Sequence, residues 1–444
     1  MPVVYQFKLT PLTPIHIGAG QNLEPFEYVV TDRLYRFDLD DFVLALSAAE
    51  RDEFMAAIEA GLTAIRDFVS ARADLAASLA CYSADVTPAA YDLYAGRIAG
   101  REAYPEIVAC IKSDDRPYIP GSSLKGALRT ALLYNAMEKD NPARDARRLE
   151  AEVFGYWRRN RPIIQDDPFR AFKVGDGSPL AESCKLRAVS VYAKRDQRWD
   201  EQVTMLVETT QGQLSDGVEL ASIHPVTFDE TFYRYHAGAF ALTPGRILAA
   251  CRDFYGAHLA AERTYTADLP ETRAVYEALT ARAEALPDHA CLIRLAWGSG
   301  RDATTVGYAL RDAPRPISRR LTTEGFPLGW AELAILDQHG RPVESEKTPP
   351  AEVVKPPTVP ARPRSIHDLV KGMVLEGTVR NVVSYGAFVD IGIGRDGLIH
   401  ISKLADHFVE RVEDVVNVGD QVRVEVIDVD IARNRFSLRL LGTI

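Results

Sequence analysis

The chain has 444 residues, of which 47% are hydrophobic and 26% are charged; at ~150 residues per domain this length indicates about three domains. No stretch approaches the ~20 consecutive apolar residues of a membrane-spanning helix, and the N-terminal segment lacks the basic and apolar regions of a secretion signal, so we expect a cytoplasmic protein without a membrane partner. The net charge of -10 argues against a protein that coats nucleic acid by bulk electrostatics.

The first 340 residues mix strands and helices without regular alternation, which predicts the α+β class. We expect strands at 3–18 and 28–39, then one long helix over 42–75, where apolar residues recur at helical spacing. From residue 172 we expect a second group of elements: strands at 184–194, 222–234 and 291–297, and helices at 244–265 and 271–286. Two tandem units, residues 1–165 and 166–340, are the predicted arrangement.

Residues 341–365 contain seven prolines and no aromatic residue, which predicts an extended linker of polyproline II type. The segment that follows, 366–444, contains five short strand-like runs separated by Gly, Asp and Asn turns, as in a small barrel. Val422, Val424 and Val426 alternate with polar residues, so this strand has one buried and one solvated face.

Residues 372–404, GMVLEGTVRNVVSYGAFVDIGIGRDGLIHISKL, closely resemble the S1 domain family, RNA-binding all-β barrels of the OB-fold type. The resemblance implies a solvent-facing patch that binds single-stranded RNA, formed by Tyr385, Phe388, His400, Lys403, Arg433 and Arg435. Exposed rings provide stacking surfaces worth ~1–3 kcal/mol per base. The alternative is that the two aromatics and the histidine are ordinary core residues.

Two glycine-rich motifs and one helix start stand out in the first 340 residues. The first motif, LTPIHIGAG at residues 12–20, contains the end of a predicted strand at His16, followed by Gly18 and Gly20. Glycine permits the backbone to approach a ligand closely. YIPGSSLKGALRTALL predicts a helix with Ser122 or Ser123 as N-cap.

In that helix Lys125 and Arg129 lie four residues apart beside the helix start, and this arrangement suits a phosphate. A capped helix with solvated cations and no ligand is the alternative. The third motif, WGSGRDATTVG, provides Gly298, Gly300, Arg301, Thr304 and Thr305, but it has neither a Walker GK[ST] nor the GxGxxG spacing of a dinucleotide site.

In order and spacing these motifs, with SRRLTTEGFPLGWAEL at 318–333, resemble the RAMP proteins of type III CRISPR effector complexes, above all subunit five of the type III-A (Csm) complex. The resemblance implies two ferredoxin-like (RRM-like) units whose motif residues hold guide RNA. It also implies a subunit that caps the guide-RNA filament at the guide 3′ end, beside the repeated backbone subunit, without cutting RNA. The S1 domain would bind the guide tail or target RNA. The presence of this domain and its linker departs from the usual pattern of the RAMP family.

We therefore expect a protein that is not an enzyme and needs no cofactor or small-molecule substrate. His16 would be the candidate base of a guide-processing ribonuclease, but no partner acid lies near it in sequence. The acidic pairs Asp114–Asp115 and Asp166–Asp167 are expected in solvated loops, and the five scattered cysteines read as reduced core thiols rather than metal ligands. A translation or RNA-decay factor built around the S1 domain is the second alternative.

Overall fold

The structure is a computed structural model, and its contacts divide the chain into two units, each described by itself. The larger, here called the body, lies within residues 2–228 and 242–348, and the smaller contains the C-terminal residues 349–444. The structure describes residues 3–100, 105–137, 146–158, 161–180, 183–196, 198–229, 232, 240–304, 317–343, 366–369, 372–404, 409, 411–430 and 435–443. Most of the predicted linker, residues 344–365, lies outside these ranges.

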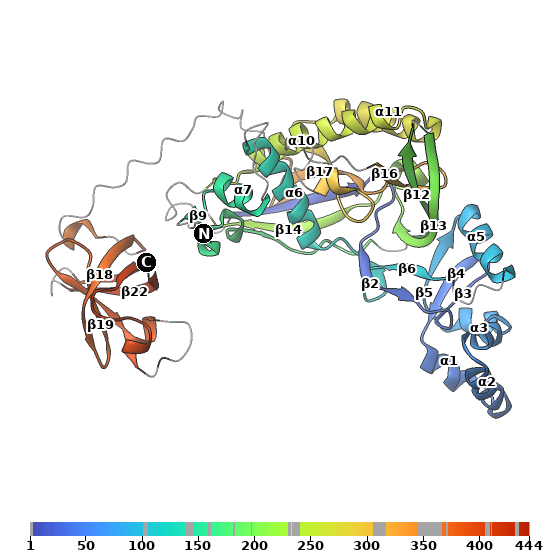
Figure 1. The fold of residues 1–444 in the computed structure, drawn as a ribbon, viewed down its shortest axis with the longest axis horizontal. Coiled ribbons are helices and arrows are strands. Elements are labelled where there is room, and N and C mark those ends of the chain that lie inside the picture. The colour runs from blue at the N-terminus through green and yellow to red at the C-terminus, as the bar shows by residue number, and fades with distance from the viewer. Residues whose placement is uncertain are drawn as a thin grey trace. The chain divides into compact units, whose positions relative to one another are not determined.

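The body contains a five-stranded sheet centred on its first strand. Its order is β11 (Phe172–Val174), β14 (Ser222–Phe228), β1 (Val3–Pro11), β17 (Trp330–Asp337) and β15 (Ala290–Arg294). β1 is antiparallel to both neighbours, and its alternate residues Phe7 and Leu9 are fully buried. The helices α10 (Pro244–Tyr265), α11 (Pro270–Ala285) and α6 (Gly121–Ala136) pack on this part of the body, with α10 in contact with both α6 and β15 (Figure 1).

The second sheet of the body has eight strands. Its order is β2 (Gly18–Leu23), β6 (Ile107–Cys110), β13 (Arg198–Thr210), β12 (Cys184–Arg195), β5 (Ala80–Val86), β4 (Arg33–Phe37) and β3 (Tyr28–Val30), with β16 (Ser318–Thr322) also paired to β12. The helix α5 (Pro88–Ala99) packs on one face, over a core that includes Leu186, Ala188 and Leu206.

The two sheets confirm the α+β class, but the predicted boundary near residue 165 does not separate them. β1 shares a sheet with three strands that follow residue 220, whereas β2 and β6 share the other sheet with β12 and β13. The reason is that β1 inserts between β14 and β17 through antiparallel pairing on both sides. Each sheet therefore takes strands from both halves of the body.

The long helix expected over 42–75 is wrong, because four short helices occupy this region. They are α1 (Leu39–Ala45), α2 (Ala48–Ala60), α3 (Leu62–Ser70) and α4 (Ala73–Ser78). Ser47 forms a capping box with Glu50 and starts α2, and Gly61 ends α2 with a φ of 102°. By contrast, α10 has the bounds that the sequence predicts, since Thr243 caps it and Pro244 occupies its first turn.

Short elements complete the body. They are α7 (Ala146–Val153), α8 (Gln213–Asp216), α12 (Arg301–Thr304), β7 (Lys112–Ser113), β8 (Arg116–Pro117), β9 (Trp157–Arg158), β10 (Arg161–Pro162), η1 (Ile164–Asp166) and η2 (Pro168–Arg170). Four cysteines are buried, but Cys81 is exposed, so its prediction as a core thiol is wrong. Within the described ranges, no helix is long and apolar enough to cross a lipid bilayer.

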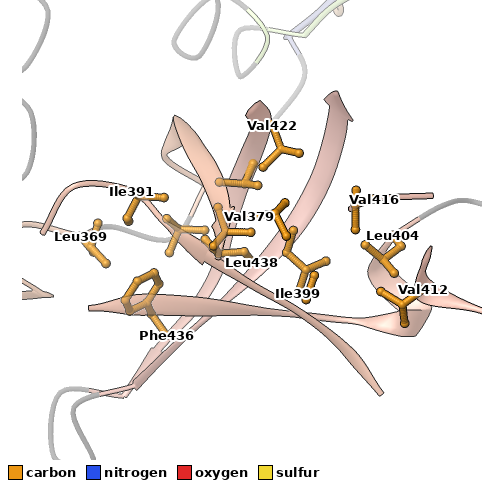
Figure 2. Packing of buried hydrophobic residues seen from close by; sticks show 14 of the residues in the cluster. Leu369, Val379, Ile391, Ile399, Leu404, Val412, Val416, Val422, Phe436 and Leu438 are labelled. Carbon is orange, nitrogen blue, oxygen red and sulfur yellow. The ribbon is translucent and has the colours of Figure 1, made fainter. Parts of the chain in front are cut away.

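The C-terminal unit is a closed five-stranded barrel, as predicted. Its strands are β18 (Val374–Val383), β19 (Gly386–Asp390), β20 (Asp396–His400), β22 (Arg435–Thr443) and β21 (Gln421–Asp430), and the short 3-10 turns are η4 (Ile366–Asp368), η5 (Ile401–Lys403) and η6 (Val412–Asp414). Figure 2 shows the core, in which side chains from several strands, including Val379, Ile399 and Leu438, converge. Val422, Val424 and Val426 are fully buried, which confirms the predicted alternation along β21.

Candidate nucleic-acid interface

The outward face of the barrel carries the predicted S1 patch. On β19 the side chains of Ala387 and Val389 fill the core, so Phe388 between them points outward and is half-buried. Phe388 pairs with Leu398 on β20, which in turn pairs with Ser437 on β22. These three residues form one row across three strands on the same outward face.

The other described residues of the patch flank this row. Tyr385 precedes β19 and is 52% exposed, while His400 ends β20 and is also exposed. Lys403 is exposed in η5 directly after His400, and Arg435 is exposed at the start of β22. The interpretation of Tyr385 and His400 as core residues is therefore wrong. Arg433 lies outside the described residues.

His400 has one ring nitrogen already engaged. The backbone N–H of Ser402 donates to its Nδ1 (3.3 Å), so His400 caps η5. A neutral imidazole that accepts at Nδ1 carries its proton on Nε2. In this tautomer His400 presents an N–H donor to a ligand, on the same outward face as Phe388.

Sequence reasoning missed Arg439 in this patch. Because β20 and β22 are parallel and Leu398 pairs with Ser437, His400 and Arg439 come two residues further along their strands and share the outward face. Arg439 is half-exposed and pairs loosely with Glu425 (3.5 Å). The signal was its alternation with the buried Leu438 in the last strand.

In the body, the structure brings the first and third glycine-rich motifs together. The backbone N–H of Trp297 donates to the carbonyl oxygen of His16 (3.0 Å), and the two residues form an antiparallel bridge. Their rings meet edge to face with centroids 5.3 Å apart. The exposed edge strand β2, which begins at Gly18, thus starts beside the loop that contains Gly298 and Gly300.

His16 itself is buried, with 1% of its surface exposed. Its Nδ1–H donates to the carbonyl oxygen of Glu208 (2.6 Å), and burial lowers the pKa of the imidazole, which keeps it neutral. The Glu208 carboxylate is also buried and accepts from Lys112, from Tyr82 OH (2.7 Å) and from the Cys110 N–H (3.0 Å). His16 therefore belongs to a satisfied polar cluster beneath β2.

The predicted N-cap of α6 is wrong. Ser122 and Ser123 lie in the first turn, the N-cap is Pro120, and no side chain of that segment caps the helix. Instead the N–H of Gly121 donates to Oδ1 of Asp176 (2.8 Å), and a side chain at Gly121 would collide with the backbone of Val174 and Gly175. A carboxylate from another segment already occupies the helix start, which disfavours a phosphate there.

Lys125 and Arg129 are bound inside the body, so neither the phosphate-site nor the solvated-cation interpretation describes them. Nζ of Lys125 donates to the carbonyl oxygens of Phe169 (2.8 Å) and Phe172 (2.7 Å). Arg129 pairs with Glu150 and with Asp167 (3.0 Å). The predicted solvated loop at 166–167 is wrong for the same reason.

The remaining predicted residues follow Trp297. Gly298 and Gly300 have φ of 86° and 83°, a backbone region that favours glycine, and a side chain at Gly298 would collide with Leu328. Arg301 begins the short α12 and Thr304 ends it; the carbonyl oxygen of Thr304 accepts from Thr130 on α6 (3.4 Å). Thr305 lies outside the described residues. The third motif thus also adjoins the second.

Two family models match the chain. The model described as "RAMP superfamily" matches residues 8–247, and the model described as "S1 RNA binding domain" matches residues 368–440. Protein YdcI of Bacillus subtilis is 46% identical over 114 residues, or 26% of this chain, and Protein tex of Bordetella pertussis is 55% identical over 76 residues, or 17% of this chain. The chain spans only 16% and 10% of the lengths of these two relatives.

Two solved structures share the fold of the body. A chain of a Csm–crRNA–target RNA ternary complex of a type III-A CRISPR-Cas system matches with a TM-score of 0.57 and 24% identity, covering 74% of this chain and 100% of that one. Csm5 of T. onnurineus matches with a TM-score of 0.53 and 21% identity, covering 73% of this chain and 99% of that one. Since the first family model spans more than half of the residues, the chain belongs to the RAMP superfamily.

Proposed function

We propose that this protein is the RNA-binding subunit of a type III-A CRISPR effector complex that caps the guide-RNA filament at the guide 3′ end. The body would bind guide RNA and the repeated backbone subunit, and the S1 barrel would bind single-stranded RNA. The observation that carries the proposal is the presence, in one chain, of a RAMP body and an S1 barrel whose outward face exposes Tyr385 and His400.

The shared fold supports the choice of complex. The chain in the ternary complex is covered over its full length by about three quarters of this chain. The linker and the barrel, residues 341–444, are about as long as the quarter of this chain that is not covered. The barrel would thus add a second RNA-binding element to a subunit of the Csm type, and the protein would act in the cytoplasm with its complex.

We also propose that the subunit does not cut RNA. A general base has to reach the proton that it removes. The imidazole of His16 is buried, its Nδ1–H is held by the carbonyl oxygen of Glu208, and Gly18 lies over Nε2, where an added side chain would come within 3.3 Å. These contacts support a structural role for His16.

Sequencing the RNA that co-purifies with the tagged full chain tests the proposal. In cells that carry a cognate CRISPR array, we expect uniform guides derived from the repeats, together with the backbone subunit. Mixed cellular RNA without other CRISPR subunits would instead favour a translation or RNA-decay factor.

The ribonuclease alternative is tested separately. Pure protein is incubated with precursor guide RNA in EDTA, beside the His16→Ala variant. We expect no cleavage by either protein; cleavage that disappears in the variant would contradict the proposal that this subunit is not a nuclease.

A further inference from the structure

Two adjacent arginines on β16 have opposite surroundings. Arg319 donates to both carboxylate oxygens of Glu262 at 2.6–3.0 Å and is fully used inside the body. Arg320 points to the other face of the sheet, because side chains alternate along a strand. Its Nε is buried without a hydrogen-bond partner, and its guanidinium takes part in none of the hydrogen bonds or ion pairs found among the described residues.

A neighbouring indole holds this unpaired guanidinium in place. Arg320 Cζ lies 4.8 Å from the ring centroid of Trp297, and the edge of the same ring meets His16. Stacking on an aromatic face fixes the plane of an arginine and leaves its N–H groups free to donate. Trp297 directly precedes Gly298, so the cation lies beside the two glycine-rich segments that the His16–Trp297 bridge joins.

The surface next to Arg320 is apolar and open. Arg320 pairs with Val191 on β12, and Val191 pairs with Val203 on β13, so the three side chains form one row on the same face (β16 lies beside β12 in Figure 1). Val191 is half-buried and Val203 is 49% exposed. The row therefore offers apolar contact at one end and a fixed positive charge at the other.

A half-buried guanidinium without an acceptor is costly, because several N–H donors are withdrawn from water. The buried Nε stays unpaired, but a phosphate can accept from the two Nη groups of this half-buried side chain, since arginine binds phosphate oxygens through two parallel hydrogen bonds. A nucleotide also has a sugar and a base to place on the valines. We propose that Arg320, stacked on Trp297, binds a backbone phosphate of single-stranded RNA; this inference rests on the proposed function of the body.

The test measures RNA affinity of the full chain against salt concentration. All variants carry Phe388→Ala and His400→Ala, so that the barrel does not mask the body. Arg320→Gln should weaken binding of a repeat-derived RNA about tenfold and reduce the slope of log K against log salt by about 0.7, the loss of one phosphate contact. Arg320→Lys should keep the slope and lose only part of the affinity.

Arg263→Gln is the matched control. It removes the same charge from an exposed position on α10, and it should leave affinity and slope unchanged. Thermal unfolding confirms that each variant is folded. If Arg320→Gln proves unstable, Trp297→Leu, which removes the ring under the guanidinium and keeps the charge, should weaken RNA binding, and an unchanged affinity would overturn the inference.

The outcomes separate this inference from the proposed function. If the unsubstituted chain binds no RNA, the proposed function fails and the inference with it. If it binds RNA, the inference alone is overturned when the chain that carries only the two barrel substitutions binds none, or when Arg320→Gln in that background behaves like the control. Normal RNA binding with loss of a neighbouring protein subunit would also overturn it, because Arg320 would then bind a carboxylate of a protein partner.

Discussion

Phe388 and His400 face outward because their neighbours in the strands, Ala387 and Ile399, fill the core of the barrel. The barrel has its own closed sheet and core, so residues 366–444 can be tested alone. In this fragment we expect Phe388→Ala with His400→Ala to weaken binding of single-stranded RNA at least tenfold, since each stacked base contributes ~1–3 kcal/mol. Fluorescence anisotropy measures the affinity.

Val418→Ala is the control for this substitution, because Val418 is 64% exposed and lies outside the patch. Its RNA affinity should equal that of the original fragment. An unchanged affinity in the folded double variant would contradict the assignment of the patch.

Arg129 shows how a partly buried cation contributes to stability. Its guanidinium also donates to the hydroxyl of Tyr156 (3.1 Å), in addition to the two carboxylates. We expect Arg129→Met to lower the free energy of unfolding by about 1–3 kcal/mol, because Glu150 and Asp167 then lose their common counter-charge in a half-buried place. Urea denaturation measures the change.

The exposed pair Arg148–Glu152 provides the comparison, since it links residues four apart on the surface of α7. Arg148→Met should cost no more than about 0.5 kcal/mol. Equal effects of the two substitutions would contradict a structural role for Arg129.

At the scale of elements, one buried carboxylate joins α10 to two strands. Glu262 on α10 accepts from Arg319 on β16 and lies 3.6 Å from Arg294 on β15. Burial alone would raise the pKa of Glu262, but the guanidinium of Arg319 outweighs burial and lowers the pKa to about 2. This carboxylate therefore stabilises the fold mainly in its charged form.

The pH dependence follows from that shift. Because the pKa is lower in the folded chain than the ordinary value of 4.5, the stabilisation is complete above pH 4.5 and is lost as pH falls toward 2. Glu262→Gln should lower the free energy of unfolding at pH 7 by about 3 kcal/mol or more. Urea denaturation at several pH values should show this difference shrinking below pH 4.5; a constant difference would contradict the assignment.

Some elements are predictable because their signals are local. The bounds of α10 follow from Thr243 and Pro244 at its start, and the alternation of valines defines β21. The start of α6 was not predictable, since its first N–H is capped by Asp176, which lies 55 residues away. The hydrogen-bond acceptors of Lys125 are carbonyl groups more than 40 residues away, and no local sequence pattern predicts these contacts.

The candidate sites divide in the same way. The S1 patch was predicted from the resemblance to the S1 family, and the observed strand alternation agrees in placing Phe388 and His400 outside the core. In the body, the sequence locates the motifs but not the contacts that their residues make. His16, for example, donates a hydrogen bond to Glu208, which lies 192 residues away. Arg320 was missed because the two adjacent arginines look alike in the sequence. Only the folded sheet puts Arg319 beside Glu262 and Arg320 on the opposite face.

At the scale of the whole molecule, the division into two units predicts that the body folds independently of the barrel. The strands and helices described for the body all lie before residue 341. Deleting residues 366–444 should leave the body folded and able to join the complex, while capture of RNA beyond the capped end weakens. Thermal unfolding and co-purification of the backbone subunit measure these results; a truncated chain that no longer assembles would make the barrel an integral part of the cap.

The central position of β1 has a consequence during protein synthesis. β1 leaves the ribosome before the other strands of its sheet, and its partner β17 is made more than 300 residues later, so the five-stranded sheet cannot close early. About a hundred residues still follow β17, and at ~5–20 residues per second they take roughly 5–20 s to translate. Attachment of the linker and barrel thus gives the body time to complete its sheet while the nascent chain is still held by the ribosome.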